Sequence, residues 1–138
     1  MRFIELITDR KPIVFFKVNP VEPTVQQAER EMAEFKDLLL KSDRIAVIVD
    51  GTEAKFLSSE VRIQQGQWIK NNTSLLSEKT VSTAYVIPSV VMQMILKCIF
   101  LIKQPPVPIQ VFSKMEEALN WSERNLEKEG LVAEVVKN

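Results

Sequence analysis

The chain has 138 residues, the usual size of a single domain, and 46% of them are hydrophobic, which is enough to build a core. Its 18 basic residues balance 18 acidic ones, so the molecule as a whole has no net attraction for nucleic acid or an anionic membrane. The sequence contains no histidine, one cysteine and three glycines. These counts exclude histidine-based triads and metal sites, an internal disulfide and the glycine-rich loops that hold nucleotide phosphates.

The cysteine content indicates an intracellular protein. Cys98 is the one cysteine of the chain, and a single cysteine fits a reducing compartment. The first residues also lack an apolar core followed by a small-residue cleavage site, as a signal peptide would have. We therefore expect a cytoplasmic protein without a metal or other cofactor. Residues 1–129 are expected to form one domain, and residues 130–138 a loosely held tail.

The first two segments are predicted to form a β-hairpin. Residues 2–8 and 13–18 are β-branched and aromatic, and polar residues with Pro12 between them indicate a turn. A helix follows, because Thr24 and Gln27 have the spacing of a capping box and apolar residues then recur at helical intervals. Its predicted buried face consists of Val25, Ala28, Met32, Phe35 and Leu39.

The middle of the chain alternates strands with helices. Residues 45–49 form an unbroken apolar run, which is typical of a strand covered on both faces, and a turn is expected at 50–52. A second helix follows and ends near 71–74, residues 80–87 form the next strand, and Ser89 begins a third helix that extends to about residue 103. The second helix is predicted to bury one stripe, made of Leu57, Val61, Trp68 and Leu75.

The last part of the domain is predicted to be one strand and one helix. Residues 104–108 contain three prolines and lead stiffly into a strand at 109–112. Ser113 and Glu116 predict a capping box for the fourth helix. The full order is β-β-α-β-α-β-α-β-α. It predicts an α/β fold with a mostly parallel, five-stranded mixed sheet, four helices and right-handed crossovers.

Two segments, together with this order of elements, resemble those of a known family. Residues 49–59 connect the third strand to the second helix, and residues 111–121 carry Glu116 and Glu117 followed by Ala, Leu and Trp. With the element order, they resemble the STAS family of anti-sigma-factor antagonists and sulphate-transporter tails, and more closely its SpoIIAA-like branch. The resemblance covers about residues 1–128 and implies a non-enzymatic regulatory or protein-interaction module. One branch of this superfamily is also similar to lipid-transfer proteins of the CRAL-TRIO kind.

A phospho-switch is the best-known site that this resemblance implies. In antagonists of the family, a partner kinase phosphorylates a serine in an Asp-Ser-Ser-Gly stretch at the start of the second helix. An ungapped alignment on Phe56 places that acceptor at Glu60, without the aspartate before it or the glycine after it. Helix capping is therefore the first interpretation of the two serines. The candidate ligand or phospho-switch region comprises Asp50, Thr52, Ser58, Ser59 and Glu60.

Asp50 has two interpretations. It follows a strand, and ligands of open α/β sheets bind outside the carboxyl ends of their strands. Alternatively, Asp50 organises a turn through hydrogen bonds to its own backbone while Gly51 supplies permissive dihedral angles. No spacing marks Asp50 and Glu60 as an acid/base pair, so we predict no catalytic residues and no enzyme.

The two tryptophans are expected to differ. Trp68 is surrounded by Arg62, Lys70 and several glutamines, a mixture that can bind nucleic acid. Because Trp68 shares the apolar stripe of its helix, a core position is favoured and no nucleic-acid binding is predicted. Trp121 projects off the apolar stripe of the last helix, so it covers an edge of the core or faces a partner.

The third helix is apolar nearly all round. Only Gln93 and Lys97 interrupt residues 90–102, and the run is too short for a membrane span. We predict that Val91, Ile95, Ile99 and Ile102 face the sheet, with Cys98 beside them as a small core residue. The opposite face then needs a cover, and the predicted interface is Val90, Met94, Lys97, Phe100 and Leu101.

Three covers are compatible with that helix: a second copy of the chain, an apolar ligand, or the last helix and tail. The leading hypothesis is a regulatory or interaction module that forms a homodimer and also binds a protein partner. The alternative is a carrier or sensor of a small apolar or lipid-like ligand.

Overall fold

The computed structural model describes residues 1–102 and 106–131, and the side chains of all of these except 98–102. The predicted order of elements is confirmed, except that the second helix is divided in two, which gives five helices in the described chain rather than four. In chain order they are β1 (Ile4–Ile7), β2 (Ile13–Val18), α1 (Val25–Lys41), β3 (Ile45–Asp50), α2 (Ser59–Asn71), α3 (Thr73–Lys79), β4 (Thr80–Val86), α4 (Val90–Ile102), β5 (Ile109–Phe112) and α5 (Met115–Lys128).

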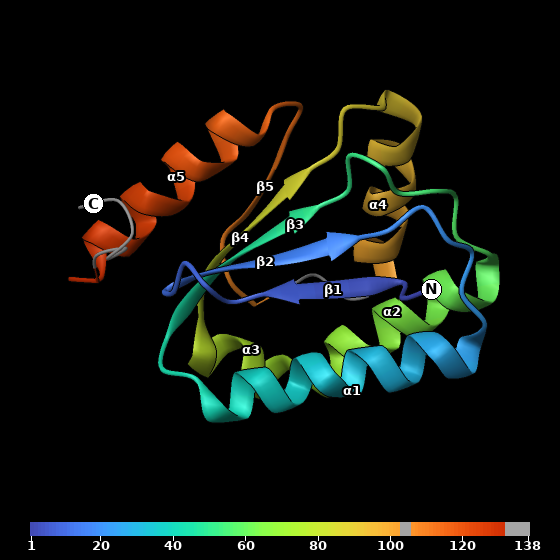
Figure 1. The fold of residues 1–138 in the computed structure, drawn as a ribbon, viewed down its shortest axis with the longest axis horizontal. Helices are drawn as coiled ribbons and strands as arrows, with labels where there is room; N and C mark the ends of the chain where they lie inside the picture. Colours follow the sequence, from blue (N-terminus) through green and yellow to red (C-terminus); the bar gives the residue numbers. More distant parts are fainter. Residues whose placement is uncertain (103–105, 132–138) are drawn as a thin grey trace.

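The five strands form one sheet in the order β1-β2-β3-β4-β5. β1 is antiparallel to β2, and all the other pairs are parallel, which confirms the predicted mixed sheet. From β2 to β5, each strand is added next to the preceding one at the same edge of the sheet. If every crossover between these parallel strands has the same hand, the helices that connect them all lie on one face of the sheet. Figure 1 shows α1, α2 and α3 below the sheet and α5 above it. The protein therefore has three layers, with α5 alone on its face.

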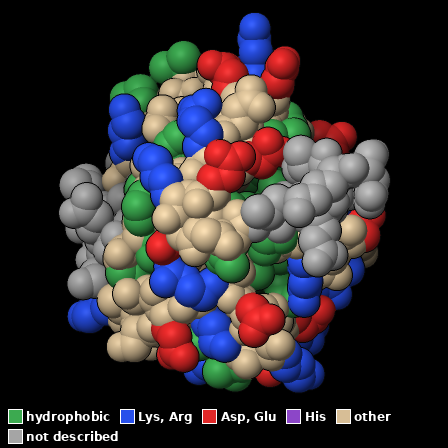
Figure 2. Space-filling view, turned by 90° about the vertical axis from the view of Figure 1, so that its left-hand side faces the viewer, with side chains coloured by type: hydrophobic (Ala, Val, Ile, Leu, Met, Phe, Trp, Pro, Cys, Tyr) green, Lys and Arg blue, Asp and Glu red, His purple; other side chains and the backbone are tan. Residues whose placement is uncertain are grey.

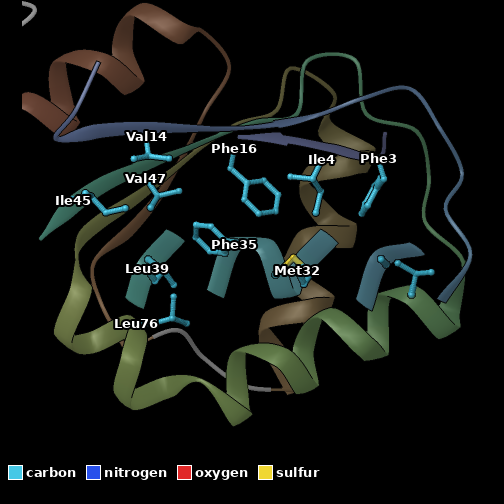
Figure 3. Close-up of a cluster of buried hydrophobic side chains, with 12 residues drawn as sticks. Phe3, Ile4, Val14, Phe16, Met32, Phe35, Leu39, Ile45, Val47 and Leu76 are labelled. Carbon is cyan, nitrogen blue, oxygen red and sulfur yellow. The ribbon is translucent and has the colours of Figure 1, made fainter. Parts of the chain in front are cut away.

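Alternation along the strands divides the interior into two cores. On β3, Ile45 and Val47 belong to the core under α1, whereas Ala46 and Ile48 belong to the core under α5. The first core contains the side chains in Figure 3, where Phe16 and Phe35 point toward each other with ring centroids 5.1 Å apart. Both faces of β3 are thus covered, as its unbroken apolar run predicts.

The Thr24 half of the predicted capping box of α1 is confirmed, whereas the predicted capping box of α5 is wrong. Thr24 accepts a hydrogen bond from the backbone N–H of Gln27 at 3.0 Å. The Gln27 side chain, however, donates to Met1 and Glu31. The N-cap of α5 is Lys114, which makes no side-chain capping bond, so Ser113 lies one residue too early for a capping box with Glu116.

Asn72 explains why the second predicted helix is two helices. Its backbone N–H bonds to the carbonyls of Trp68 and Ile69, and its side chain donates to the Trp68 carbonyl at 2.8 Å. The backbone bond to Trp68 is the ordinary α-helical one. The Ile69 carbonyl, which the N–H of Thr73 would need in a continuing α2, accepts from Asn72 and from the Thr73 hydroxyl instead. Leu75 therefore belongs to α3, a separate helix, although it still packs against the first core.

A buried carboxylate attaches the start of β1 to α1. Glu31 is 3% exposed and accepts hydrogen bonds from the backbone N–H groups of Phe3 and Ile4. Burial raises the pKa of Glu31, but these bonds, a bond from Gln27 and the charge of Arg2 outweigh it, so the pKa is lower than usual. The sequence analysis did not identify this contact, because it joins residues about 28 positions apart.

The end of the described chain completes the second core. Trp121 is half-buried, and its ring lies 5.7 Å from that of Phe112, so it covers an edge of this core. Leu131 also packs there. Residues 104 and 105 of the predicted connector at 104–108 lie outside the described residues, as do residue 103 and residues 132–138 of the predicted tail.

Candidate functional site: a cavity beneath helix α4

A cavity of about 170 Å³ lies between the sheet and the helices of the first core. Strands β3 and β4, helices α1, α2 and α4, and the loop from β3 to α2 all contribute to its walls. The walls are almost entirely apolar. Representative lining residues are Phe35, Val49, Trp68, Met92, Ile95 and Leu96.

The position of α4 creates this space. α1 runs along the strands, whereas α4 stands across them and packs chiefly against α2 (Figures 1 and 3). On the face of β4 toward α4, Thr83 and Tyr85 are only half-buried and line the cavity. On the opposite face, Ala84 and Val86 are completely buried. The central strands are therefore fully covered by α5 but not by α4.

The predicted orientation of α4 is wrong in part. Val91 is 54% exposed and does not face the sheet, whereas Ile95 lines the cavity as expected. The inward stripe is Met92, Ile95 and Leu96, whose spacing of three and four residues fits one helix face. The sequence could not fix this rotation, because α4 lacks the polar face that would define its outside. The side chains of Cys98, Ile99 and Ile102 lie outside the described residues.

A few polar groups interrupt the apolar walls. Gln65 of α2 lines the cavity, and its buried Nε2 has no hydrogen-bond partner among the described residues. Lys55, Thr83 and Tyr85 are the other polar members. A phenol is neutral at physiological pH at its ordinary pKa of 10.0, and burial raises the pKa of Tyr85 further. Lys55 is therefore the charged side chain of the described lining.

The loop from β3 to α2 forms part of the cavity wall and is attached to β4. The backbone N–H of Gly51 donates to the carbonyl of Val86 at 2.9 Å. A Cβ on Gly51 would lie 3.2 Å from that oxygen and 3.3 Å from Cγ1 of Ile87. Glycine at position 51 suits this close approach, because a Cβ would push its neighbours back by a few tenths of an ångström. The expected permissive dihedral angles are not the reason, since only Gly130 has positive φ in the described chain.

The predicted site residues lie beside the cavity but are absent from its described lining. Asp50 accepts hydrogen bonds from the backbone N–H and hydroxyl of Thr52, at 3.1 and 2.7 Å, which confirms its role in the turn. Ser58 is the N-cap of α2 and accepts from the N–H of Val61 at 3.2 Å. Ser59 accepts instead from the Arg62 guanidinium at 3.0 Å, and Glu60 is exposed in the first turn of the helix.

The lining residues of the loop and of α2 were not predicted as a site. The cavity instead takes Gly51, Ala54, Lys55 and Leu57 from the loop. A sequence signal for the wall did exist on β4, where Thr83 and Tyr85 share one face of an otherwise buried strand.

The outer face of α4 is apolar and exposed. Val90, Val91 and Met94 are 70%, 54% and 62% exposed, and Lys97 on the same side is also exposed. Val90, Met94 and Lys97 thus have the accessibility that the predicted interface needs. Val91, by contrast, was predicted to face the sheet. The side chains of Phe100 and Leu101 lie outside the described residues.

Charged side chains form no patch of one sign on the face drawn in Figure 2, and the described residues hold no metal-binding cluster. Figure 2 shows basic and acidic side chains interspersed over the end of the molecule drawn on the left of Figure 1. The described residues contain no group of three Cys, Asp or Glu side chains placed to hold a metal ion. Within residues 1–102 and 106–131, no helix has the length and hydropathy to cross a membrane.

Solved structures with the same architecture define the class of fold. The chain is similar to an uncharacterized protein of the DUF3478 family with a SpoIIAA-like fold from Shewanella loihica PV-4. The TM-score is 0.59 and the identity 16%, over 86% of this chain and 91% of that one. It is also similar to an anti-sigma factor antagonist from Mycobacterium paratuberculosis. Here the TM-score is 0.51 and the identity 15%, over 86% and 93% of the two chains. The protein thus has the SpoIIAA-like, STAS-type fold that its sequence predicts.

A sequence family also matches most of the chain. The chain belongs to the family described as Domain of unknown function (DUF7793), whose pattern matches residues 7–125. No curated protein matches the sequence.

Proposed function

We propose that this protein is a non-enzymatic regulatory module of the STAS type, acting in the cytoplasm by binding protein surfaces and pairing with a second copy of itself. The observation that carries the proposal is the exposed apolar face of α4, where Val90, Val91 and Met94 lie together. Soluble monomers rarely display a contiguous apolar patch without a use for it. The likeness to an anti-sigma factor antagonist supports a regulatory role, because that protein has the same fold.

A second copy is the partner that this face fits best. Two-fold pairing apposes the same patch on both chains, so one exposed helix face supplies both halves of the interface. Each Å² of apolar surface removed from water contributes about 25 cal/mol. Lys97 is compatible with the contact, because its stem can lie along apolar surface while its ammonium reaches the rim.

The test is a charge placed in the patch. Met94→Glu should weaken dimerisation at least about tenfold, because an unpaired carboxylate is costly to bury. Leu40→Glu is the matched control: Leu40 is 55% exposed, but on α1. Sedimentation equilibrium measures the dimer, and circular dichroism confirms that both variants fold. A wild-type protein that is monomeric at every concentration, or equal weakening by Leu40→Glu, would refute self-association through α4.

A second candidate function is supported by the cavity. Its apolar walls fit the interior of a carrier or sensor for a small apolar or lipid-like molecule. Native mass spectrometry of protein purified from its own host, without detergent, tests this function. A retained small-molecule mass would support it, whereas a bare chain that also fails to take up apolar probes would count against it.

A further inference from the structure

We propose that the cavity beneath α4 binds a small molecule with an apolar body and one carboxylate, held by Lys55 and Gln65. The inference deepens the second proposed function, on which it rests, by assigning the chemistry of the ligand. Three observations carry it: the size of the cavity, an unsatisfied donor in its wall, and an unpaired cation in its lining.

The volume of the cavity limits the apolar body. An apolar cavity of about 150 Å³ is large enough to admit benzene. The present cavity, at about 170 Å³, therefore accommodates a ring or an aliphatic chain of similar size. Met92, Ile95 and Leu96 on one side and Val49 on the other offer only dispersion contacts to such a body.

The amide of Gln65 provides the first polar anchor. Its Nε2 is buried, lines the cavity and has no hydrogen-bond acceptor among the described residues. A buried donor left unsatisfied costs about 1–3 kcal/mol. An oxygen on the ligand would remove that cost, whereas a purely apolar ligand would leave it in place. The ligand is therefore expected to present a hydrogen-bond acceptor toward α2.

The positive charge of Lys55 indicates that the hydrogen-bond acceptor on the ligand is an anion. Lys55 is exposed yet lines the cavity, which places it where the cavity meets solvent. Glu53, a nearby carboxylate of the same loop, pairs with Lys17 at 3.5 Å, and Lys55 forms no ion pair with any described residue. A carboxylate can accept from both Gln65 and Lys55, and bonds to charged groups are the stronger kind. An amine in the same place would be repelled.

Hexanoate is the probe that tests the inference on the intact protein. Hexanoate combines a five-carbon chain with a carboxylate, 1-hexanol carries an uncharged hydroxyl on a six-carbon chain, and acetate keeps the charge with a single methyl group. Calorimetric titration should show saturable binding of hexanoate, at least about tenfold weaker binding of 1-hexanol and no binding of acetate. The melting temperature should rise with hexanoate concentration.

Two substitutions locate the carboxylate. Lys55→Gln and Gln65→Leu should each weaken the binding of hexanoate about tenfold. Lys55→Gln should leave the affinity for 1-hexanol within about twofold of the wild-type value. Lys70→Gln and Gln67→Leu are the matched controls, because both residues are exposed on α2 and absent from the described lining. Ile95→Trp, which fills the cavity from α4, should abolish binding of both probes while melting confirms a folded protein.

The possible results distinguish a failure of the carboxylate assignment from a failure of the carrier or sensor function. If 1-hexanol binds as tightly as hexanoate and Lys55→Gln has no effect, the carboxylate assignment is wrong while the sensor or carrier function stands. If neither probe binds and Ile95→Trp changes nothing, both fail. The Met94→Glu variant should bind hexanoate normally, because Met94 lies on the outer face of α4, so loss of self-association alone leaves this inference intact.

Discussion

The two faces of the sheet are built in opposite ways from the same strands. Toward α5, small residues such as Ala46, Ala84 and Ala118 are completely buried, so the helix lies close to the strands. Toward α4, Val49, Thr83 and Tyr85 of the same strands border a cavity. One face of the sheet is therefore closed, whereas the other keeps a cavity that the fold tolerates.

The hollow is confined to part of its face. Toward α1 the cavity is bounded by packed aromatic rings, since Phe35 lies between Phe16 and Trp68 with ring centroids 5.1 and 5.6 Å away, and all three residues line the cavity. The cavity continues from these rings to the inner face of α4, whose described side chains are at most half-buried, whereas α1 buries Met32, Phe35 and Leu39. Stability should therefore depend on α5 and α1 much more than on α4.

The largest expected effect compares one leucine from each face. Leu126→Ala in α5 should lower the free energy of unfolding by about 2–5 kcal/mol, because Leu126 is completely buried and the closed packing cannot collapse around the loss. Leu96→Ala in α4 should cost only about 1 kcal/mol, since Leu96 is half-buried and already borders a cavity. Urea unfolding measures both, and equal losses would contradict the division between the faces.

A smaller effect is expected where α1 holds the start of β1. Glu31→Gln should cost about 1–3 kcal/mol, because the buried N–H groups of Phe3 and Ile4 lose a charged acceptor. Glu34→Gln is the matched control: Glu34 is on the same helix but half-exposed, and it pairs with Arg2 at 2.9 Å. Its loss should be within about 1 kcal/mol. Urea unfolding near pH 7 measures the difference.

The same variants predict a pH dependence. The folded pKa of Glu31 lies below the ordinary value of 4.5, so its contribution to stability is present above that pH and is lost as the pH falls through the folded pKa. The gap in unfolding free energy between wild type and Glu31→Gln should therefore shrink on acidification below pH 4.5. A gap that stays constant from pH 7 to about pH 3 would show that the ionised carboxylate is not the stabilising form.

The smallest effect tests the helix end beside the cavity. Ser58→Ala should lose about 1 kcal/mol through the capping bond to Val61, and Ser59→Ala should stay within about 0.5 kcal/mol. Ser58→Asp should keep the stability of wild type, because aspartate is an equally good N-cap. If Ser58→Asp remained folded but lost the dimer in sedimentation, a phospho-switch at this helix would replace simple capping as its role.

The sequence determined the elements and their order because their signals are local. Thr24 and Gln27 marked the start of α1, and the unbroken apolar run of β3 predicted a strand covered on both faces. Right-handed crossovers then restricted the arrangement to one mixed sheet with helices on its faces. The turn at Asp50 and the cap at the start of α2 were predictable for the same reason, since each depends on residues two or three positions apart.

The tertiary structure alone decided how α4 is turned and where space remains. A helix that is apolar nearly all round has no polar stripe to define its outside, so Val91 was assigned inward although it is exposed. The cavity depends on distances between α2, α4 and β4, and these follow from the packing of all the side chains together. Gln65 and Lys55 became candidates for the same reason: they are distant from β4 in sequence, and only the folded chain brings all three to one cavity.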